Sequence, residues 1–187
     1  MCRKGKIYDF DASIVLLLRS MLNLEELELN IVVQCYEKFI SGDTLKKDIL
    51  IYMPRLYKFT FNICSIICHR NQTNFPLNES IEKTFKYFSN TQIITCIDHF
   101  QEERYSQCHI YSYPYKLKVY NNITNNFRGG LFTSVTEVSL HDERPFEHEF
   151  FLRIAQSFPF MDQISLTNKI SQNDKLCGVN QRMTPDT

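Results

Sequence analysis

The amino-acid sequence predicts an α/β solenoid, in which parallel strands alternate with helices along the chain. The first observation is a pattern of apolar residues, apolar-x-x-apolar-x-apolar, that recurs four times. The second is that three copies follow a helix-like stretch closing on Met21-Leu22, Met53-Pro54 or Phe158-Pro159. A helix–strand unit repeated along a chain is typical of solenoids. The copies are Leu24, Leu27, Leu29; Leu56, Phe59, Phe61; Val135, Val138, Leu140; and Met161, Ile164, Leu166.

The spacing of the copies favours an irregular leucine-rich-repeat-like solenoid. Equivalent positions are separated by 32 residues between Leu29 and Phe61 and by 26 between Leu140 and Leu166. Leucine-rich repeats run about 20–29 residues, so one spacing fits and the other is stretched. The stretch from Ile63 to Thr133 contains strand-like segments without a clean repeat. We therefore predict parallel strands with intervening helices, interrupted in the middle.

Periodicity and chain breakers predict the individual elements. Asp9 or Asp11 can cap a helix running to about Leu22, whose continuous apolar residues lead us to expect a well buried helix. Apolar residues at i, i+3, i+4 and i+7 predict a helix over 32–40, and apolar residues on one face predict helices over 44–52 and 79–88. Alternation and short apolar runs predict strands at residues 25–30, 57–62, 93–97, 105–113, 137–141 and 163–167. Residues 121–130, rich in Asn and ending in Gly-Gly, are predicted to form a loop.

The clearest predicted helix follows Asp142-Glu143-Arg144-Pro145. Proline suits the first turn of a helix, because its missing N–H would have no partner there. Phe146, Phe150, Ile154 and Phe158 then form an apolar stripe at intervals of four residues. Beyond about Ile170 the chain turns polar and loses periodicity. We therefore assign residues 7–170 to one domain and residues 171–187 to a loose polar tail.

Composition excludes several classes of function. The formal net charge of the 187 residues is zero, and no Lys/Arg cluster is denser than Lys46-Lys47 or Arg3-Lys4, so we expect no nucleic-acid partner. No apolar run reaches the ~18 residues that span a bilayer, so we expect no membrane segment. The basic residues 1–6 are followed by acidic ones and by no small-x-small cleavage site. The expected location is intracellular, either cytoplasmic or nuclear.

The seven cysteines favour a reduced protein without cofactors. Most of them sit among apolar neighbours, where a free thiol packs like a small hydrophobic side chain. A zinc site built on Cys64, Cys68 and His69 is an alternative, but no second pair of ligands is fixed by spacing. We expect no cofactor and no metal.

Two segments resemble the degenerate leucine-rich-repeat tails of F-box-like proteins. They are Met53-Pro54-Arg55-Leu56-Tyr57-Lys58-Phe59-Thr60-Phe61 and Glu147-His148-Glu149-Phe150-Phe151-Leu152-Arg153-Ile154-Ala155-Gln156-Ser157-Phe158-Pro159. The resemblance runs from about Ile14 to Leu166. It implies a module that holds the target of a cullin-RING ubiquitin ligase, joined to the ligase adaptor through an F-box. The sequence lacks the F-box, whose opening Leu-Pro dipeptide does not precede the first predicted strand.

The expected function is protein–protein recognition without enzyme activity. The alternative is a metal-dependent enzyme built on the cluster between His141 and Glu149, because imidazole and carboxylate groups are suitable ligands. The same acidic residues are also typical of a helix N-terminus. In the preferred interpretation, strand side chains that alternate with the apolar ones form the binding surface. These partner-binding candidates are Glu26, Glu28, Asn30, Lys58, Thr60, Asn62, Glu137, Ser139, His141, Gln163, Ser165 and Thr167.

Overall fold

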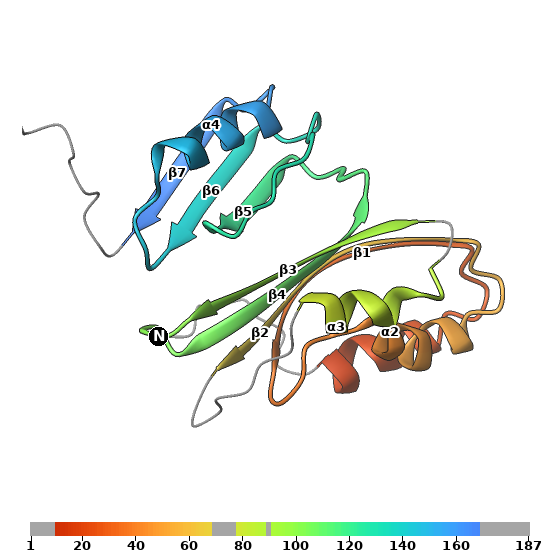
Figure 1. Ribbon diagram of the computed structural model, residues 1–187. Helices are drawn as coiled ribbons and strands as arrows, with labels where there is room; N and C mark the ends of the chain where they lie inside the picture. Colours follow the sequence, from red (N-terminus) through yellow and green to blue (C-terminus); the bar gives the residue numbers. More distant parts are fainter. Residues whose placement is uncertain (1–9, 69–77, 89–90, 169–187) are drawn as a thin grey trace, which may run out of the picture.

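The computed structural model describes residues 10–68, 78–88 and 91–168, and arranges them as a mixed α/β fold with two sheets (Figure 1). The predicted domain limits at residues 7 and 170, the polar tail 171–187 and His69 lie outside the described residues. Among the residues described, no helix is both long enough and apolar enough to cross a membrane.

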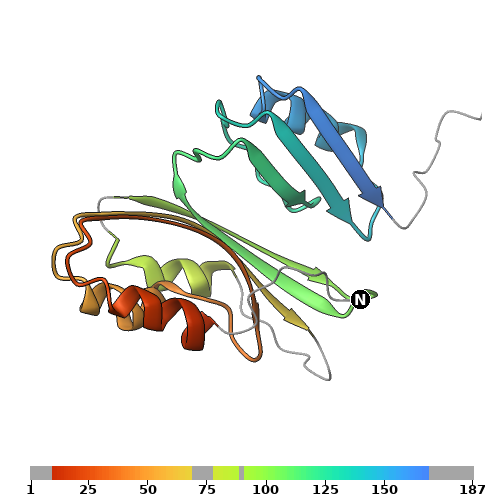
Figure 2. The same ribbon diagram turned by 180° about the vertical axis from the view of Figure 1, so that it is seen from behind.

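The first sheet has four strands in the order β1-β2-β4-β3. Strands β1 and β2 are parallel, whereas β4 runs antiparallel to both β2 and β3. Short helices cover one face of this sheet (Figures 1 and 2). The strands are β1 (Glu26–Cys35), β2 (Lys58–Cys68), β3 (Gln92–Phe100) and β4 (Tyr105–Tyr113). The helices are η1 (Phe10–Val15), α1 (Leu16–Arg19), α2 (Gly42–Asp48), η2 (Leu50–Tyr52), α3 (Asn78–Glu82) and η3 (Lys83–Phe85).

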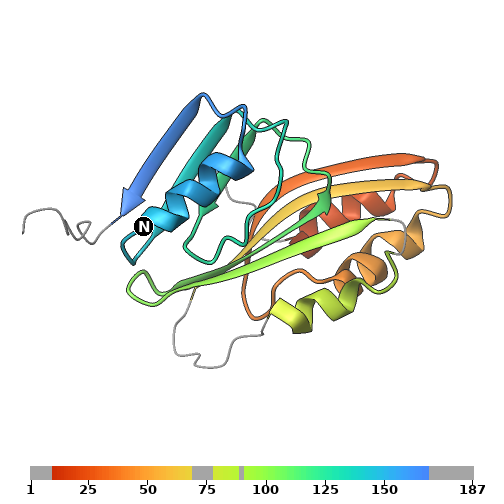
Figure 3. The same ribbon diagram turned by 45° about the horizontal axis from the view of Figure 1, so that its top comes forward.

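The second sheet has three parallel strands in the order β5-β6-β7, with α4 packed on one face (Figure 3). Its elements are β5 (Val119–Ile123), β6 (Glu137–Asp142), α4 (His148–Ser157) and β7 (Gln163–Asn168). A parallel strand pair requires a crossover, and α4 supplies the crossover between β6 and β7. The predicted apolar stripe is buried at all four positions, Phe146, Phe150, Ile154 and Phe158. The predicted start of the helix is wrong, because α4 begins at His148 and Pro145 therefore precedes its first turn.

Each sheet has its own hydrophobic core. The first core lies between the helices and the first sheet, with Leu29, Val33, Phe61 and Ile63 at its centre. The second core lies under α4 and is rich in aromatic rings. Tyr111 of β4 belongs to the second core, and its ring lies 5.8 Å from that of Tyr120 on β5. The outer face of the first sheet therefore packs against the second core at β3 and β4, through Ile94 and Tyr111.

The predicted leucine-rich-repeat-like solenoid is wrong. Two pairs of repeat strands do lie parallel, with Leu27 opposite Phe59 and Val138 opposite Ile164. However, the second repeat strand pairs with β4, and the third repeat strand belongs to a different sheet. The β3–β4 hairpin explains the difference, because it occupies the edge of β2 that a third repeat strand would need. The four repeat strands therefore form two separate parallel pairs, β1–β2 and β6–β7, and do not stack into one continuous sheet.

Two local predictions are also wrong. Residues 32–35 continue β1 and do not begin a helix, because Val32 and Val33 pair with Cys64 and Ser65 of β2. Pairing with a neighbouring strand overrides the helical periodicity of this stretch. The first helix is less buried than predicted, since Leu16 and Leu17 are 61% and 57% exposed.

Candidate functional site

The structure divides the predicted partner-binding residues between the two sheets. On the first sheet, three pairs are in register and face away from the helices: Glu26 with Lys58, Glu28 with Thr60, and Asn30 with Asn62. We call these six residues the β1–β2 face. On the second sheet the pairs are Glu137 with Gln163, Ser139 with Ser165, and His141 with Thr167. The residues form two short surfaces and not the single concave surface of a solenoid.

Polar contacts order the β1–β2 face. The Lys58 Nζ donates to Glu26 Oε2 at 2.5 Å, and the Tyr57 hydroxyl donates to Glu26 Oε1 at 2.7 Å. These hydrogen bonds, led by the one from Lys58, lower the pKa of the Glu26 carboxyl. Two pairs further along, beyond Glu28 and Thr60, Asn62 Nδ2 donates to Asn30 Oδ1 at 3.1 Å. Because most of these residues are solvent-exposed, the contacts orient side chains more than they stabilise the fold.

A narrow crease runs beside this face. Glu28, Asn30, Thr60 and Asn62 form one wall, and residues 114–117 form part of the other. The Tyr115 hydroxyl lies 3.4 Å from Asn62 Nδ2 and donates to Val119 O at 2.9 Å, so it connects the two walls. The crease holds about 30 Å³, roughly the volume of one water molecule. It is far smaller than the ~300–1,000 Å³ typical of small-molecule sites.

A row of sulfur and imidazole groups lies deeper on the same outer face. Cys64 of β2, His109 of β4 and Cys96 of β3 are neighbours in register. His109 Nε2 hydrogen-bonds Asn62 Oδ1, and its ring packs against Tyr111, 5.1 Å away between centroids. Burial lowers the pKa of His109 to about 4 and raises that of the Cys96 thiol. This row therefore holds a neutral His109 imidazole beside a protonated Cys96 thiol.

The predicted His141–Glu149 cluster is not assembled into one site. His141 Nε2 lies 3.3 Å from Glu103 Oε2, and Glu143 Oε1 accepts from the Glu103 backbone N–H at 2.8 Å. Glu147, His148 and Glu149 are exposed at the start of α4. Nowhere in the described part of the chain do three His, Cys, Asp or Glu side chains converge as a metal ion would require.

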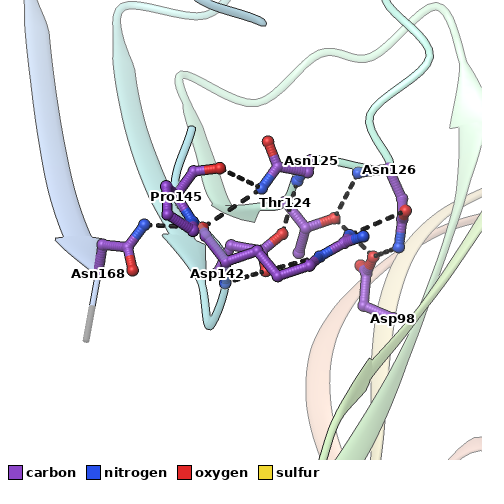
Figure 4. A network of polar contacts seen from close by, with 8 residues as sticks. Asp98, Thr124, Asn125, Asn126, Asp142, Pro145 and Asn168 are labelled. Atoms are coloured by element: carbon purple, nitrogen blue, oxygen red, sulfur yellow. Dashed lines mark hydrogen bonds and ion pairs between the residues drawn. The ribbon is translucent and has the colours of Figure 1, made fainter. Parts of the chain in front are cut away.

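A polar network joins the carboxyl ends of β3, β5, β6 and β7 (Figure 4). Asp98 of β3 is 3% exposed, and its Oδ1 accepts from Thr124 Oγ1 at 2.5 Å and from Asn126 Nδ2 at 2.9 Å. Its Oδ2 accepts from Gln107 Nε2 at 3.3 Å. Asp98 therefore ties the first sheet to the segment that follows β5.

Asp142 continues this network on the second sheet (Figure 4). Its carboxylate accepts the backbone N–H groups of Asn125 at 2.8 Å and Arg144 at 2.9 Å. Asn125 Nδ2 donates to the Pro145 carbonyl, and Asn168 Nδ2 of β7 donates to that of Arg144. A hollow of about 440 Å³ opens beside Asp98 and Asp142. Both carboxylates are already engaged, so their first role is to fix the loops between the sheets.

Sequence reasoning missed Asp98, Thr124 and Asn126. The Asn-rich segment was predicted to be a loop, and Asp98 directly follows the strand predicted at residues 93–97. A carboxylate that directly follows an apolar run was the available signal, because such a group needs donors from elsewhere in the fold if it is buried.

Comparisons with known proteins give no relative. No family model, no curated protein and no solved structure matches the chain.

Proposed function

We propose that this protein is a recognition module that binds another protein through the β1–β2 face. The observation that carries the proposal is a set of polar side chains in register on two adjacent strands, four of them exposed and two half-buried. Hydrogen bonds order the pairs at the two ends of this set. Strand faces left open to water with fixed side chains offer a template for a partner surface. The crease beside the face is too small for a metabolite, which favours a macromolecular partner.

The net charge of the β1–β2 face indicates which charge a partner surface should carry. Lys58 pairs with Glu26 and leaves Glu28 as the second carboxylate of the face. Lys116 lies at the rim of the crease and interacts electrostatically with Glu26. The face is thus close to neutral with a small acidic excess. A neutral or weakly basic patch on the partner complements it better than an acidic one.

Packing between the sheets supports a rigid binding surface. Asn62 of the face hydrogen-bonds both the Tyr115 hydroxyl and His109. His109 contacts Tyr111 and Tyr120, which belong to the second core. The outer face of β2 is therefore held by the aromatic core of the second sheet. A surface ordered before binding loses less conformational entropy when the partner binds.

A more specific form of the proposal is that the chain holds the target of an F-box-type ubiquitin ligase. It rests only on the resemblance of residues 53–61 and 147–159 to F-box-like proteins. Co-purification of a longer form of the chain with a cullin-RING adaptor would support it. If a longer form folds and does not bind the adaptor, the ubiquitin-ligase proposal is wrong, whereas the broader proposal of protein recognition is unaffected.

The broader proposal is tested by affinity capture with matched variants. The parent protein, a Glu28→Lys/Asn30→Arg variant and a Glu79→Lys control are immobilised, and captured proteins are quantified by mass spectrometry. Glu79 is exposed on α3, on the helix side of the first sheet, so its variant controls for a change of charge. We expect at least one protein that both parent and control capture and the double variant loses. Identical capture by three folded proteins would place binding elsewhere.

A further inference from the structure

The last strand of the second sheet has a bare edge. Strand β7 ends the order β5-β6-β7, so no described strand lies along its outer side. Ile164 and Leu166 face the α4 side, as do their partners Val138 and Leu140. Val138 and Leu140 are buried, but Ile164 and Leu166 are 51% and 47% exposed. The helix layer thus covers β6 and leaves β7 uncovered.

This edge also lacks the features that keep strand edges apart. Natural sheets protect edges with charges, proline or bulges. The β7 residues, Gln-Ile-Ser-Leu-Thr-Asn, include neither a charge nor a proline. In contrast, β1 carries Glu26 and Glu28, and β5 is interrupted by a register shift near Asn122, whose φ is 56°. Of these three edges, β7 is the one open to another strand.

We propose that β7 pairs with β7 of a second copy of this chain, antiparallel about a two-fold axis at Ser165. Gln163 donates its N–H to Thr136 O on the β6 side. Since successive residues of a strand point their backbone groups to opposite sides, those of Ile164 and Leu166 point outward. The two-fold axis at Ser165 places Ile164 of one copy opposite Leu166 of the other. These are the residues that must exchange N–H···O bonds in an antiparallel pair.

The side chains match in the same register. Ile164 meets Leu166 on the α4 side, and Gln163 meets Thr167 on the other side, so apolar residues oppose apolar ones and polar oppose polar ones. No two like charges come together, because β7 is uncharged. A second copy is therefore a better occupant than a charged strand.

The helices also fit the two-fold arrangement. In the proposed pairing, the α4 face of one copy continues into the α4 face of the other. Both α4 helices therefore lie on one side of a six-stranded sheet. Strands are about 4.8 Å apart, so helices over β6 or over the β6–β7 gap would lie about 10–14 Å apart. Helix axes pack at about 8–10 Å, and larger separations need filling by side chains. Phe151 is half-buried and follows Phe150 on α4. It lies on the side of α4 opposite Arg153, which hydrogen-bonds the Phe127 carbonyl, and is therefore placed to fill the gap between the two α4 helices.

The first test is the oligomeric state of the full chain under reducing conditions. Light scattering after gel filtration, over a concentration series, is expected to show mass rising toward twice the 22.2 kDa of one chain. Leu166→Lys puts a charge on the two-fold seam and is expected to give monomer at all concentrations. Glu147→Lys, at an exposed position before α4, is the charge control and is expected to dimerise like the parent.

The second test fixes the register by cross-linking. Ser165→Cys brings two thiols face to face at the axis, where the non-hydrogen-bonded pair has its closest side chains. Gln163→Cys and Thr167→Cys each face the other residue of the partner, so neither links to itself. We expect the Ser165→Cys variant to form at least ten times more oxidised dimer than these two and than the parent.

Three results would overturn the proposal. If the parent protein stays monomeric at millimolar concentration, β7 does not pair with a second copy. If its Ile164 and Leu166 amides nevertheless exchange slowly with deuterium, the chain's own residues 169–187 occupy the edge. A dimer that survives Leu166→Lys, or equal cross-linking of the three cysteine variants, places the interface on another surface.

Discussion

Lowering the pH is expected to destabilise this protein through one half-buried histidine, His109, which lies between the two sheets. His109 is hydrogen-bonded to Asn62 and surrounded by tyrosine rings. Burial lowers its pKa from 6.5 to about 4. The unfolded chain therefore binds a proton near pH 6.5, whereas the folded chain binds it only near pH 4. Between these values the unfolded state holds more protons, so the free energy of unfolding falls as the pH is lowered.

The size of the effect follows from the two pKa values. At pH 7 both states are mostly unprotonated at this imidazole, and its contribution is close to zero. At pH 5 the unfolded imidazole is protonated and the folded one is mostly not. The difference between the two pH values is about 2 kcal/mol of lost stability. Below pH 4 both states bind the proton, and the loss from this residue stops increasing.

The assay is denaturant unfolding at pH 7 and pH 5 with the parent and His109→Gln. The variant keeps an amide that can donate to Asn62 and removes the titrating group. We expect the parent to lose about 2 kcal/mol more than the variant over this interval. Taking the difference between the two proteins cancels the carboxylates, which titrate in both.

His148→Gln is the matched control, because His148 is an exposed histidine at the start of α4. It is expected to keep the parent's pH dependence. If the parent and His109→Gln lose the same stability within about 0.5 kcal/mol, the imidazole is not desolvated as the structure shows. An NMR titration of the His109 ring that gives a midpoint near 6.5 would refute the reasoning directly.

Three further predictions concern stability, each measured by equilibrium denaturation. Phe150→Ala should cost about 3–5 kcal/mol, because Phe150 is 3% exposed in the second core; a loss below about 1 kcal/mol would contradict its packing. Gly42→Ala should cost about 1–3 kcal/mol, since a Cβ there would lie 2.3 Å from the Thr84 carbonyl oxygen. Asp43→Ala is the control, because it adds no atom; equal losses of stability in the two variants would argue against the clash. Asp98→Ala should cost about 2–3 kcal/mol by removing the acceptor of four side-chain donors, namely Cys96, Gln107, Thr124 and Asn126. A neutral result would show that water replaces the carboxylate.

Local pattern predicted much of the secondary structure. The apolar-x-apolar cores at Leu27/Leu29, Phe59/Phe61, Val138/Leu140 and Ile164/Leu166 all lie in strands, and the first two and last two pair in parallel at equivalent positions. The stripe that begins at Phe146 is buried as predicted. These features follow from alternation and helical periodicity, which act over a few residues.

The candidate site was predicted only in part. The outward direction of Glu28, Asn30 and Thr60 follows from alternation along a strand, and the structure places them together on one face. Their separation from Ser139 and Ser165 could not be predicted, because it depends on which strands become neighbours. The Asp98 network was equally inaccessible, since most of its donors come from residues distant in the chain, at positions 107, 124 and 126.

The sequence by itself determined most of the strands and the apolar face of each, because alternation depends on side chains a few positions apart. It did not determine the end of β1 or the strand β5, which pairing with neighbouring strands decided. Only the tertiary structure decided that the repeats end as two parallel pairs in separate sheets. The β3–β4 hairpin takes the edge of β2, and its aromatic outer face packs on the second core. Strand order is a competition between edges far apart in the chain, and a local pattern shared by four segments does not say which of them will pair.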